Sequence, residues 1–372
     1  MALLSDCYLP RLGGIEVQTH DLARELRAQG HEVEVFTATA GPGGERHGEV
    51  TVVDGVPVHR LAVRLPGGLP VNPLAPPELR RRLVGGRFDV AHVQTGVVSP
   101  FAWDATRVAL ALGLPTAMTW HCMLADLAPV FDAGRFVRRW AARGVAMSAV
   151  SDVAAEPLRG LVGQAATVAV LPNGIDVDRW AVGPTERTPG PLRLVTAMRL
   201  AKRKRPAALI DIVARAESLA GRASLMLTVL GEGPERARVE RHVREHDLAW
   251  VHLPGRVTRE ELRERYAASD VYLSPVRLES FGIAALEART VGLPVIGRSG
   301  SGVGEFVEPG VNGLVVDSDD EMASAIARLA TDPGELASMR AWNVANPPRQ
   351  RWADVARLAV AEYERAVSLA RR

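Results

Sequence analysis

Cysteine is almost absent from this chain of 372 residues. The only two, Cys7 and Cys122, are too few for a disulfide framework, and their neighbours do not follow a zinc-binding pattern. The scarcity excludes a small disulfide-stabilised secreted scaffold. It fits a protein of a reducing compartment.

An excess of charge of one sign is also missing. Lysine and arginine together number 45 and aspartate and glutamate 43, which leaves a formal net charge of +2 at pH 7. This balance gives no support for nucleic acid as a partner. Lysine itself is scarce, because Lys202 and Lys204 are the only lysines among the basic residues. We interpret the arginine bias as mutational, as in a GC-rich bacterial genome, and it draws attention to the segment that keeps both lysines.

A targeting segment and a convincing membrane span are absent as well. The first residues lack the basic start and the long apolar stretch of a signal peptide. The best candidate for a span, residues 108–125, is broken by Gly113 and Pro115 and would leave His121 in lipid. We therefore expect a cytoplasmic protein that associates at most peripherally with the inner face of the membrane.

Several common ligand-binding motifs fail. The dinucleotide fingerprint needs a third glycine, but Arg236 and Val307 stand at that place in the two candidate stretches. Neither a P-loop nor a Gly-x-Ser-x-Gly hydrolase elbow occurs. Asp176-Val-Asp178 has the spacing of a metal-binding pair, but it follows an Asn-Gly turn, and we expect Asp178 to cap a short helix instead. The sequence thus predicts no metal and no cofactor.

The chain instead alternates strands with helices, and its length predicts two domains. In the first half the pattern predicts a hairpin over 49–61, helices over 15–29 and 100–112, and strands over 2–5, 31–36, 88–94, 116–120, 145–150 and 167–171. In the second half it predicts strands over 192–197, 224–230, 251–253, 271–274 and 293–296. Such alternation is typical of an α/β fold with doubly wound parallel sheets covered on both faces.

A segment rich in proline and glycine separates the two halves. We predict that residues 181–191 form a linker between an N-terminal domain, residues 1–180, and a C-terminal domain, residues 192–348. The helix-period residues 349–372 are expected to pack back on the N-terminal domain. Two such domains would place a ligand cleft between them, at the carboxyl ends of both sheets.

The most informative stretch holds two carboxylates eight positions apart, Glu279 and Glu287, around Ser280-Phe281-Gly282. If a helix starts near Phe281, Glu279 precedes it and Glu287 lies about two turns inside. The free amides of the first turn would then point out beside Glu279 and could bind phosphate. This arrangement suits a nucleotide-diphosphate sugar. The alternative is that Glu279 only interacts favourably with the helix dipole and that Glu287 is solvated.

This stretch resembles the Glu-x7-Glu motif of the family-four retaining glycosyltransferases. Their GT-B architecture has two Rossmann-like domains that face each other across a cleft. Other segments resemble the family in the same order along nearly the whole chain: Gly13-Gly14-Ile15-Glu16 resembles its glycine loop, Pro172-Asn173-Gly174-Ile175-Asp176 its turn before the linker, Arg199-x4-Lys204 its diphosphate clamp, and residues 230–235 its nucleotide-side loop.

The resemblance implies a role for each matching residue. Glu279 would contact the transferred sugar and Glu287 the ribose, while Arg199 and Lys204 would hold the diphosphate. His121 would lie near the reacting sugar, although a hydrogen-bonded core histidine is the alternative. The implied catalytic residues are His121, Glu279, Arg199 and Lys204; the implied donor-binding residues are Gly13, Gly14, Arg199, Lys204, Gly231, Glu279, Ser280, Phe281, Gly282, Ile283 and Glu287. Arg289 departs from the small residues usual there, and we expect it to be exposed.

The implied activity is transfer of a hexose, with retention, from a nucleotide sugar to a hydroxyl group. The resemblance implies an N-terminal domain on the acceptor side and a C-terminal domain that binds the nucleotide sugar. GDP-mannose and UDP-hexoses are the leading donors, and the acceptor could be a lipid, a glycan or a small molecule. A nucleotide-sugar epimerase of the same fold and a non-catalytic nucleotide-sugar-binding subunit are the alternatives.

Two basic stretches could bring the protein to an anionic membrane. Arg80-Arg81-Arg82 precedes Leu83-Val84, and a second helix-period stretch places arginines 135, 138, 139 and 143 among Phe136, Val137 and Trp140. Basic and partly apolar surfaces of this kind can dock on anionic lipid. A solvated arginine face in an arginine-biased protein is the alternative.

Overall fold

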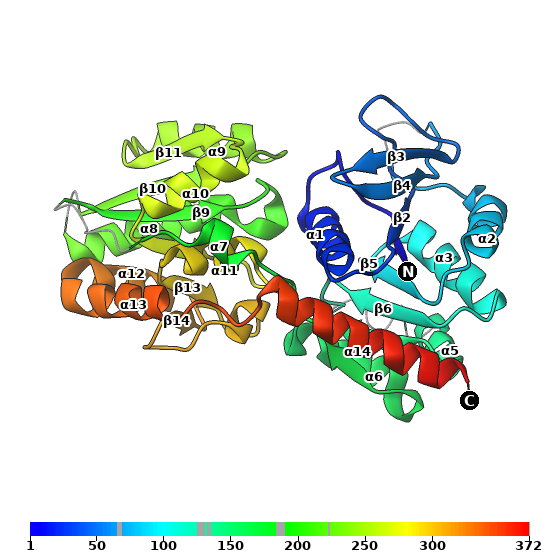
Figure 1. The fold of residues 1–372 in the computed structure, drawn as a ribbon. Coiled ribbons are helices and arrows are strands. Elements are labelled where there is room, and N and C mark those ends of the chain that lie inside the picture. The colour runs from blue at the N-terminus through cyan, green and yellow to red at the C-terminus, as the bar shows by residue number, and fades with distance from the viewer. Residues whose placement is uncertain (65–68, 125–130, 132–134, 184–189, 222–223, 372) are drawn as a thin grey trace. The chain divides into compact units, whose positions relative to one another are not determined.

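The computed structural model describes residues 1–372 except 65–68, 125–130, 132–134, 184–189, 222–223 and 372 (Figure 1). The chain forms two compact units. Unit 1 comprises Met1–Gly174 and Gln350–Arg372, and unit 2 comprises Ile175–Arg349. The division therefore falls after Gly174, six residues before the predicted boundary, because helix α7 (Val177–Trp180) packs on α11 (Ile283–Val291) of unit 2. Residues 184–189 of the predicted linker lie outside the described residues.

Unit 1 is built on one sheet in the strand order β3-β4-β2-β1-β5-β6-β7-β8. All neighbouring strands are parallel except the hairpin of β3 and β4, whose turn residues Asp54 and Gly55 both have positive φ, 46° and 79°. The strands are β1 (Ala2–Ser5), β2 (Glu34–Thr37), β3 (Glu49–Val53), β4 (Val56–Arg60), β5 (Ala91–Thr95), β6 (Thr116–Trp120), β7 (Ala146–Ala149) and β8 (Val168–Val170).

The helices of unit 1 cover both faces of this sheet (Figure 1). On one face, Leu22 and Leu26 of α1 and Tyr363 of α14 pack on Leu3 and Val35 of the central strands. The C-terminal helix α14 thus packs on α1, β6 and β7, within the unit that begins the chain. The helices are α1 (Gly14–Ala28), α2 (Ala75–Gly86), α3 (Pro100–Ala111), α5 (Phe136–Ala142), α6 (Asp152–Val162) and α14 (Trp352–Ala370), with the 3-10 turn η3 (Gly163–Ala165).

Unit 2 is built on a fully parallel sheet in the order β11-β10-β9-β12-β13-β14. Its strands are β9 (Leu192–Ala197), β10 (Leu225–Leu230), β11 (Val251–Gly255), β12 (Val271–Ser274), β13 (Val295–Arg298) and β14 (Gly313–Val316). Alternate side chains of β12 point to opposite faces, as a strand requires. Val271 and Leu273 enter the core beneath α8 (Pro206–Ala220) and α12 (Asp319–Thr331), whereas Tyr272 contacts Tyr266 of α10 (Arg259–Ala267) on the other face.

The helices of unit 2 are α7, α8 (Pro206–Ala220), α9 (Arg236–Glu245), α10 (Arg259–Ala267), α11, α12 (Asp319–Thr331) and α13 (Pro333–Ala345), with 3-10 turns η4 (Lys202–Lys204) and η5 (Gly302–Glu305). Thr258 and Glu261 form a capping box at the start of α10. The predicted α/β class, with strands and helices alternating along two Rossmann-like units, is confirmed.

Each sheet has one place where the strand order reverses. In unit 1 the chain runs outward from β1 through β2 on one side and from β5 through β6 on the other; in unit 2 it does so from β9 and β12. Open α/β sheets bind ligands just beyond the carboxyl ends of the strands at this point. The segments after β1, β6, β9 and β12 are therefore the places to look for a site.

Candidate functional site

The two predicted diphosphate-binding residues follow β9 directly. Arg199 is exposed in the loop after the strand, and Lys204 is the last residue of the short turn η4. The ammonium of Lys204 contacts a carboxylate oxygen of Glu279, and both side chains are less than one-fifth exposed. Because Glu279 lies in the loop after β12, this contact joins the two segments at the point of strand reversal.

The loop after β12 leads into the N-terminus of α11. The helix begins at Ile283, two residues later than predicted, so Glu287 lies just over one turn inside it rather than two. Gly282 precedes the helix in the left-handed region, with φ 92°, and offers no side chain to cap its first amides. Ser280 is half-buried and Phe281 is buried, so the Glu279 loop is anchored beside open helical amides.

Close backbone approaches fix this loop and its neighbour. The amide of Gly302 donates to the carbonyl oxygen of Glu279 at 2.7 Å, and a Cβ at Gly302 would lie 2.5 Å from the Cα of Phe281. Gly231, after β10, has φ 126°, and a Cβ there would lie 2.0 Å from the carbonyl oxygen of Met198. Only glycine permits either contact.

Glu287 is buried in α11, with 7% of its surface exposed. The structure therefore does not support the alternative of a solvated carboxylate there. Its neighbour on the helix, Arg289, was expected to be exposed, and this prediction is wrong. Arg289 is 6% exposed, its Nε donates to Asn343 Oδ1 at 3.3 Å, and its guanidinium lies 5.6 Å from the ring of Trp342. Burial lowers the pKa of Arg289 to about 10.

In unit 1 the predicted glycine loop opens helix α1. Gly13 is the residue before the helix and Gly14 its first residue, and both are exposed. The carboxylate of Glu16 folds back beneath them, since a Cβ at Gly13 would lie 2.5 Å from Glu16 Oε2. Burial raises the pKa of Glu16, and Arg11 lies 3.3 Å from its Oε1. A side chain at position 13 would therefore collide with the carboxylate of Glu16.

His121 follows β6 and is part of a polar network under the sheet edge. Its Nε2 donates to Gln94 Oε1 at 2.5 Å, and Gln94 in turn lies 3.1 Å from the ring nitrogens of His92. His92 also hydrogen-bonds Tyr363 of α14 at 2.9 Å and Thr119 at 2.7 Å.

The network around His121 is uncharged at neutral pH. Burial lowers the pKa of His121 to about 4, although its hydrogen bond to Asn173 acts the other way. Burial also lowers the pKa of His92 to about 3. Both imidazoles are therefore neutral at pH 7, and a small pocket lined by Gln18, Asn173 and Trp352 opens beside them.

One residue of the Asp176-Val-Asp178 stretch caps a helix. Asp176, not Asp178 as predicted, caps helix α7, because its Oδ1 accepts from the amide of Arg179 at 3.0 Å. Within the described ranges, three or more metal-binding side chains do not gather anywhere. Every described helix is too short or too polar to span a bilayer.

The structure brings the predicted residues together within each unit. Unit 2 joins Lys204 to Glu279 and places Gly231, Ser280–Ile283 and Glu287 around the ends of β9, β10 and β12. Unit 1 places Gly13 and Gly14 after β1 and His121 after β6. Sequence reasoning missed three residues that support the site. Gln94 hydrogen-bonds His121, and Gly302 donates to the backbone of Glu279. Arg205, next to Lys204, donates to the backbone of Pro275. Only Arg205, adjacent to the recognised clamp, could have been suspected from its position.

Two family models match the chain in succession. Glycosyltransferase Family 4 matches residues 12–179, and Glycosyl transferases group 1 matches residues 184–344. The chain belongs to glycosyltransferase family 4. It is similar to the D-inositol 3-phosphate glycosyltransferase of Pseudarthrobacter chlorophenolicus, with 28% identity over 95% of this chain and 91% of that protein. A GDP-mannose-dependent alpha-(1-6)-phosphatidylinositol monomannoside mannosyltransferase of Mycobacterium tuberculosis is 27% identical, over 91% of each chain.

Solved structures confirm the GT-B fold of this family-four glycosyltransferase. HepE of Anabaena, in complex with UDP, superimposes with a TM-score of 0.75 and 17% identity, covering 98% of this chain and 99% of that one. Sucrose-phosphate synthase of Thermosynechococcus elongatus also gives a TM-score of 0.75, with 20% identity over 99% of this chain and 98% of that one. The predicted pair of Rossmann-like domains is therefore confirmed.

Proposed function

We propose that the protein transfers a hexosyl group, with retention at the anomeric carbon, from a nucleotide-diphosphate sugar to a hydroxyl of a lipid, glycan or small-molecule acceptor. The contact between Lys204 and Glu279 carries the proposal. It pairs a cation suited to phosphate with a carboxylate suited to sugar hydroxyls, beside the open amides of α11.

The chemistry follows from where charge develops. When the bond between the anomeric carbon and the phosphate oxygen breaks, its electron pair stays on the departing diphosphate. Lys204, Arg199 and the first amides of α11 would stabilise that charge, and no metal is needed for this step. The acceptor oxygen bonds to the same face of the anomeric carbon and passes its proton to the departing phosphate. Glu279 positions the sugar, and Glu287 the ribose.

The side chains of unit 1 would serve the uncharged groups. His121 is neutral at pH 7 and offers hydrogen bonding without a charge, which suits a sugar or acceptor hydroxyl. Gly13 and Gly14 leave the backbone at the start of α1 open to a phosphate. The printed names of the relatives make GDP-mannose the first donor to test and inositol-containing acceptors the first class of acceptor. UDP-hexoses follow, because HepE was solved with UDP-glucose.

A peripheral membrane contact is part of the proposal, on α2 rather than α5. On α5 the apolar residues Val137 and Trp140 are buried and Phe136 is half-buried, so this helix offers little apolar surface. On α2, Val84 is 59% exposed and Arg80 and Arg81 are exposed beside it. This surface suits the headgroups of anionic lipid and would bring the protein to a lipid acceptor.

The test is turnover. The purified protein is first screened by thermal shift against GDP-mannose, UDP-glucose and related donors. It is then incubated with the stabilising donor and candidate acceptors, and released nucleotide and the anomeric configuration of the product are measured. We expect an α-linked product from an α-linked donor, formed equally well in excess EDTA. An inverted product would contradict retention, and activity that EDTA abolishes and magnesium restores would contradict a metal-free mechanism. Epimerised donor without transfer would favour an epimerase, and donor binding without any reaction would favour a non-catalytic subunit.

A further inference from the structure

Arg205, directly after Lys204, has a backbone conformation that needs support. Its φ is 60°, in the left-handed region, and it is the residue that precedes helix α8. Residues other than glycine are disfavoured in this conformation, so the surrounding structure must hold the backbone of Arg205 in place. Such support beside a candidate catalytic lysine indicates that the position of this backbone matters.

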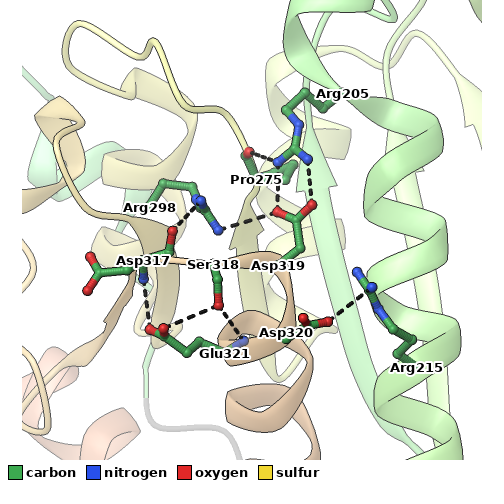
Figure 2. Close-up of polar contacts among 9 residues, drawn as sticks. All are labelled: Arg205, Arg215, Pro275, Arg298, Asp317, Ser318, Asp319, Asp320 and Glu321. Atoms are coloured by element: carbon green, nitrogen blue, oxygen red, sulfur yellow. Dashed lines mark hydrogen bonds and ion pairs between the residues drawn. The ribbon is translucent and has the colours of Figure 1, made fainter.

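Three hydrogen bonds from the guanidinium of Arg205 supply that support. Arg205 donates to the two carboxylate oxygens of Asp319 at 3.0 and 2.6 Å, and to the carbonyl oxygen of Pro275 at 3.0 Å (Figure 2). Pro275 begins the loop that carries Glu279, and Asp319 is the first residue of α12. Arg205 therefore joins the Lys204 segment to the Glu279 loop through the backbone, independently of the contact between their side chains.

Asp319 is itself held from a second side. Arg298, at the end of β13, donates to Asp319 Oδ1 at 3.3 Å and to the carbonyl oxygen of Asp317 at 2.5 Å (Figure 2). The hydrogen bonds from Arg205, with the charges of Arg205, Arg298 and Arg277, lower the pKa of Asp319. The anchor for Arg205 is thus an ionised carboxylate with little freedom to move.

We propose that Arg205 is a positioning residue for the donor site, and that Asp319 is its anchor. The ion pair keeps the backbone of Lys204 at a fixed place relative to the Glu279 loop, so that the ammonium can leave Glu279 for a diphosphate without the segment moving. This inference rests on the proposed function, because it assigns the diphosphate to Lys204. Arg205 acts through Lys204 and is not assigned a contact with the substrate.

Arg205→Gly is the informative substitution, since glycine keeps the left-handed backbone while the whole side chain, with its guanidinium, is removed. Asp319→Asn removes the anchor's charge and provides a second variant. Arg215 and Asp320 supply the matched control: they form an ion pair at 3.0 Å between α8 and α12, and Figure 2 shows it beside the pair of Arg205 and Asp319. Arg215 is half exposed and lies within α8, ten positions after Arg205, so Arg215→Ala should leave the donor site unchanged.

The readout is the affinity for GDP and UDP by calorimetry, with thermal unfolding to establish that each variant is folded. We expect Arg205→Gly and Asp319→Asn each to weaken the affinity about tenfold, Arg205→Lys to weaken it less, and Arg215→Ala to leave it unchanged. The decisive variant combines Lys204→Ala with Arg205→Gly. If Arg205 acts through Lys204, the double variant binds no more weakly than Lys204→Ala alone.

Losses that multiply in the double variant would overturn the inference, because Arg205 would then act on the ligand independently of Lys204. Unchanged affinity in Arg205→Gly and Asp319→Asn would overturn it as well, and so would equal losses in Arg215→Ala. If Lys204→Ala itself binds both nucleotides normally, the assignment of the diphosphate fails, and this inference fails with it. A loss in Lys204→Ala without a loss in Arg205→Gly leaves the proposed function standing and rejects only the role of Arg205.

Discussion

The two units present their candidate residues in opposite electrostatic states. In unit 2, Lys204 is paired with Glu279, and Arg205 and Arg298 with Asp319, so the region is held by ion pairs. In unit 1, His121 and His92 are kept neutral by burial and are joined through an amide, Gln94. Under the proposed function, the charged region of unit 2 would serve the diphosphate leaving group and the neutral network of unit 1 the uncharged hydroxyls.

The same difference determines which interactions stabilise each site. In unit 2, Lys204 can exchange partners when an anionic ligand arrives, because a phosphate can replace the carboxylate of Glu279. The network of unit 1 depends on every buried polar atom having a partner, and a charge introduced there would be expensive. We therefore expect the units to respond differently to substitution, pH and salt.

The largest effect is expected at Glu279. Glu279→Ala removes the carboxylate assigned to the sugar, and turnover at saturating donor should fall on the order of a hundredfold or more. Affinity for the free nucleoside diphosphate should change little, because it carries no sugar. The check combines steady-state rates with calorimetry. Lost nucleotide binding with normal turnover at saturation would place Glu279 elsewhere.

Replacing a buried arginine outside the site tests whether only the cations assigned to the ligand affect nucleotide affinity in unit 2. Arg289→Met removes a guanidinium that donates to Asn343 and packs on Trp342, so Asn343 Oδ1 loses that donor. Urea unfolding should show a loss of about 2 kcal/mol. Affinity for GDP or UDP should remain as in the unaltered protein, and a large fall would mean that any cation of unit 2 affects the site.

The neutral histidines of unit 1 predict a dependence of stability on pH. In the unfolded chain, histidines titrate near 6.5, whereas the native pKa of His92 is about 3 and that of His121 about 4. Between pH 6.5 and 4 the unfolded state binds more protons, so stability falls as the pH falls, by at most about 1.4 kcal/mol per pH unit for each histidine.

Asp6 acts in the opposite direction over part of this range. Burial raises its pKa to about 6, so the native state binds the additional proton between pH 6 and 4 and stability rises as the pH falls. The free energy of unfolding should therefore fall more steeply from pH 7 to 5 in Asp6→Asn than in the unaltered protein. His92→Gln should flatten the dependence, and an unchanged slope in both variants would contradict neutral buried imidazoles.

The smallest effect concerns the membrane. The exposed arginines of α2 predict sedimentation with anionic vesicles that salt weakens, each charge contributing about 1 kcal/mol near the surface. Replacing Arg80 and Arg81 by glutamine removes two such charges and should reduce binding about thirtyfold, while the same change at Arg138 and Arg139 of α5 serves as the control. No binding at low salt would contradict a membrane contact through α2.

Much of the fold could be predicted from the sequence because the signals are local. Strands β1, β6, β9 and β12 have the predicted bounds, since each is a short apolar run with turn residues at its end. Strand β14 and the outer helices α12 and α13 were not assigned. The predicted exposure of Arg289 was wrong because it depends on Asn343 and Trp342, more than fifty positions away.

The site shows the same limit. The spacing of Glu279 and Glu287 indicated the carboxylates, and a family resemblance indicated Arg199 and Lys204; their roles remain predictions. What no local pattern could show is the contact of Lys204 with Glu279, the donation from Arg205 to Pro275, or the link from His121 through Gln94 to His92. These depend on which strands become neighbours in the sheet, and that is decided by the packing of the whole unit.

The most direct test of the account is whether the cation of unit 2 recognises the diphosphate. Calorimetry should compare GDP and UDP with guanosine and uridine, for the unaltered protein and for Lys204→Ala. A charge-assisted hydrogen bond contributes about 1.5–3 kcal/mol, so the nucleotide that binds should lose roughly tenfold to a hundredfold in affinity, while its nucleoside binds both proteins equally. Equal affinity of the two proteins for the nucleoside diphosphate would contradict the central claim.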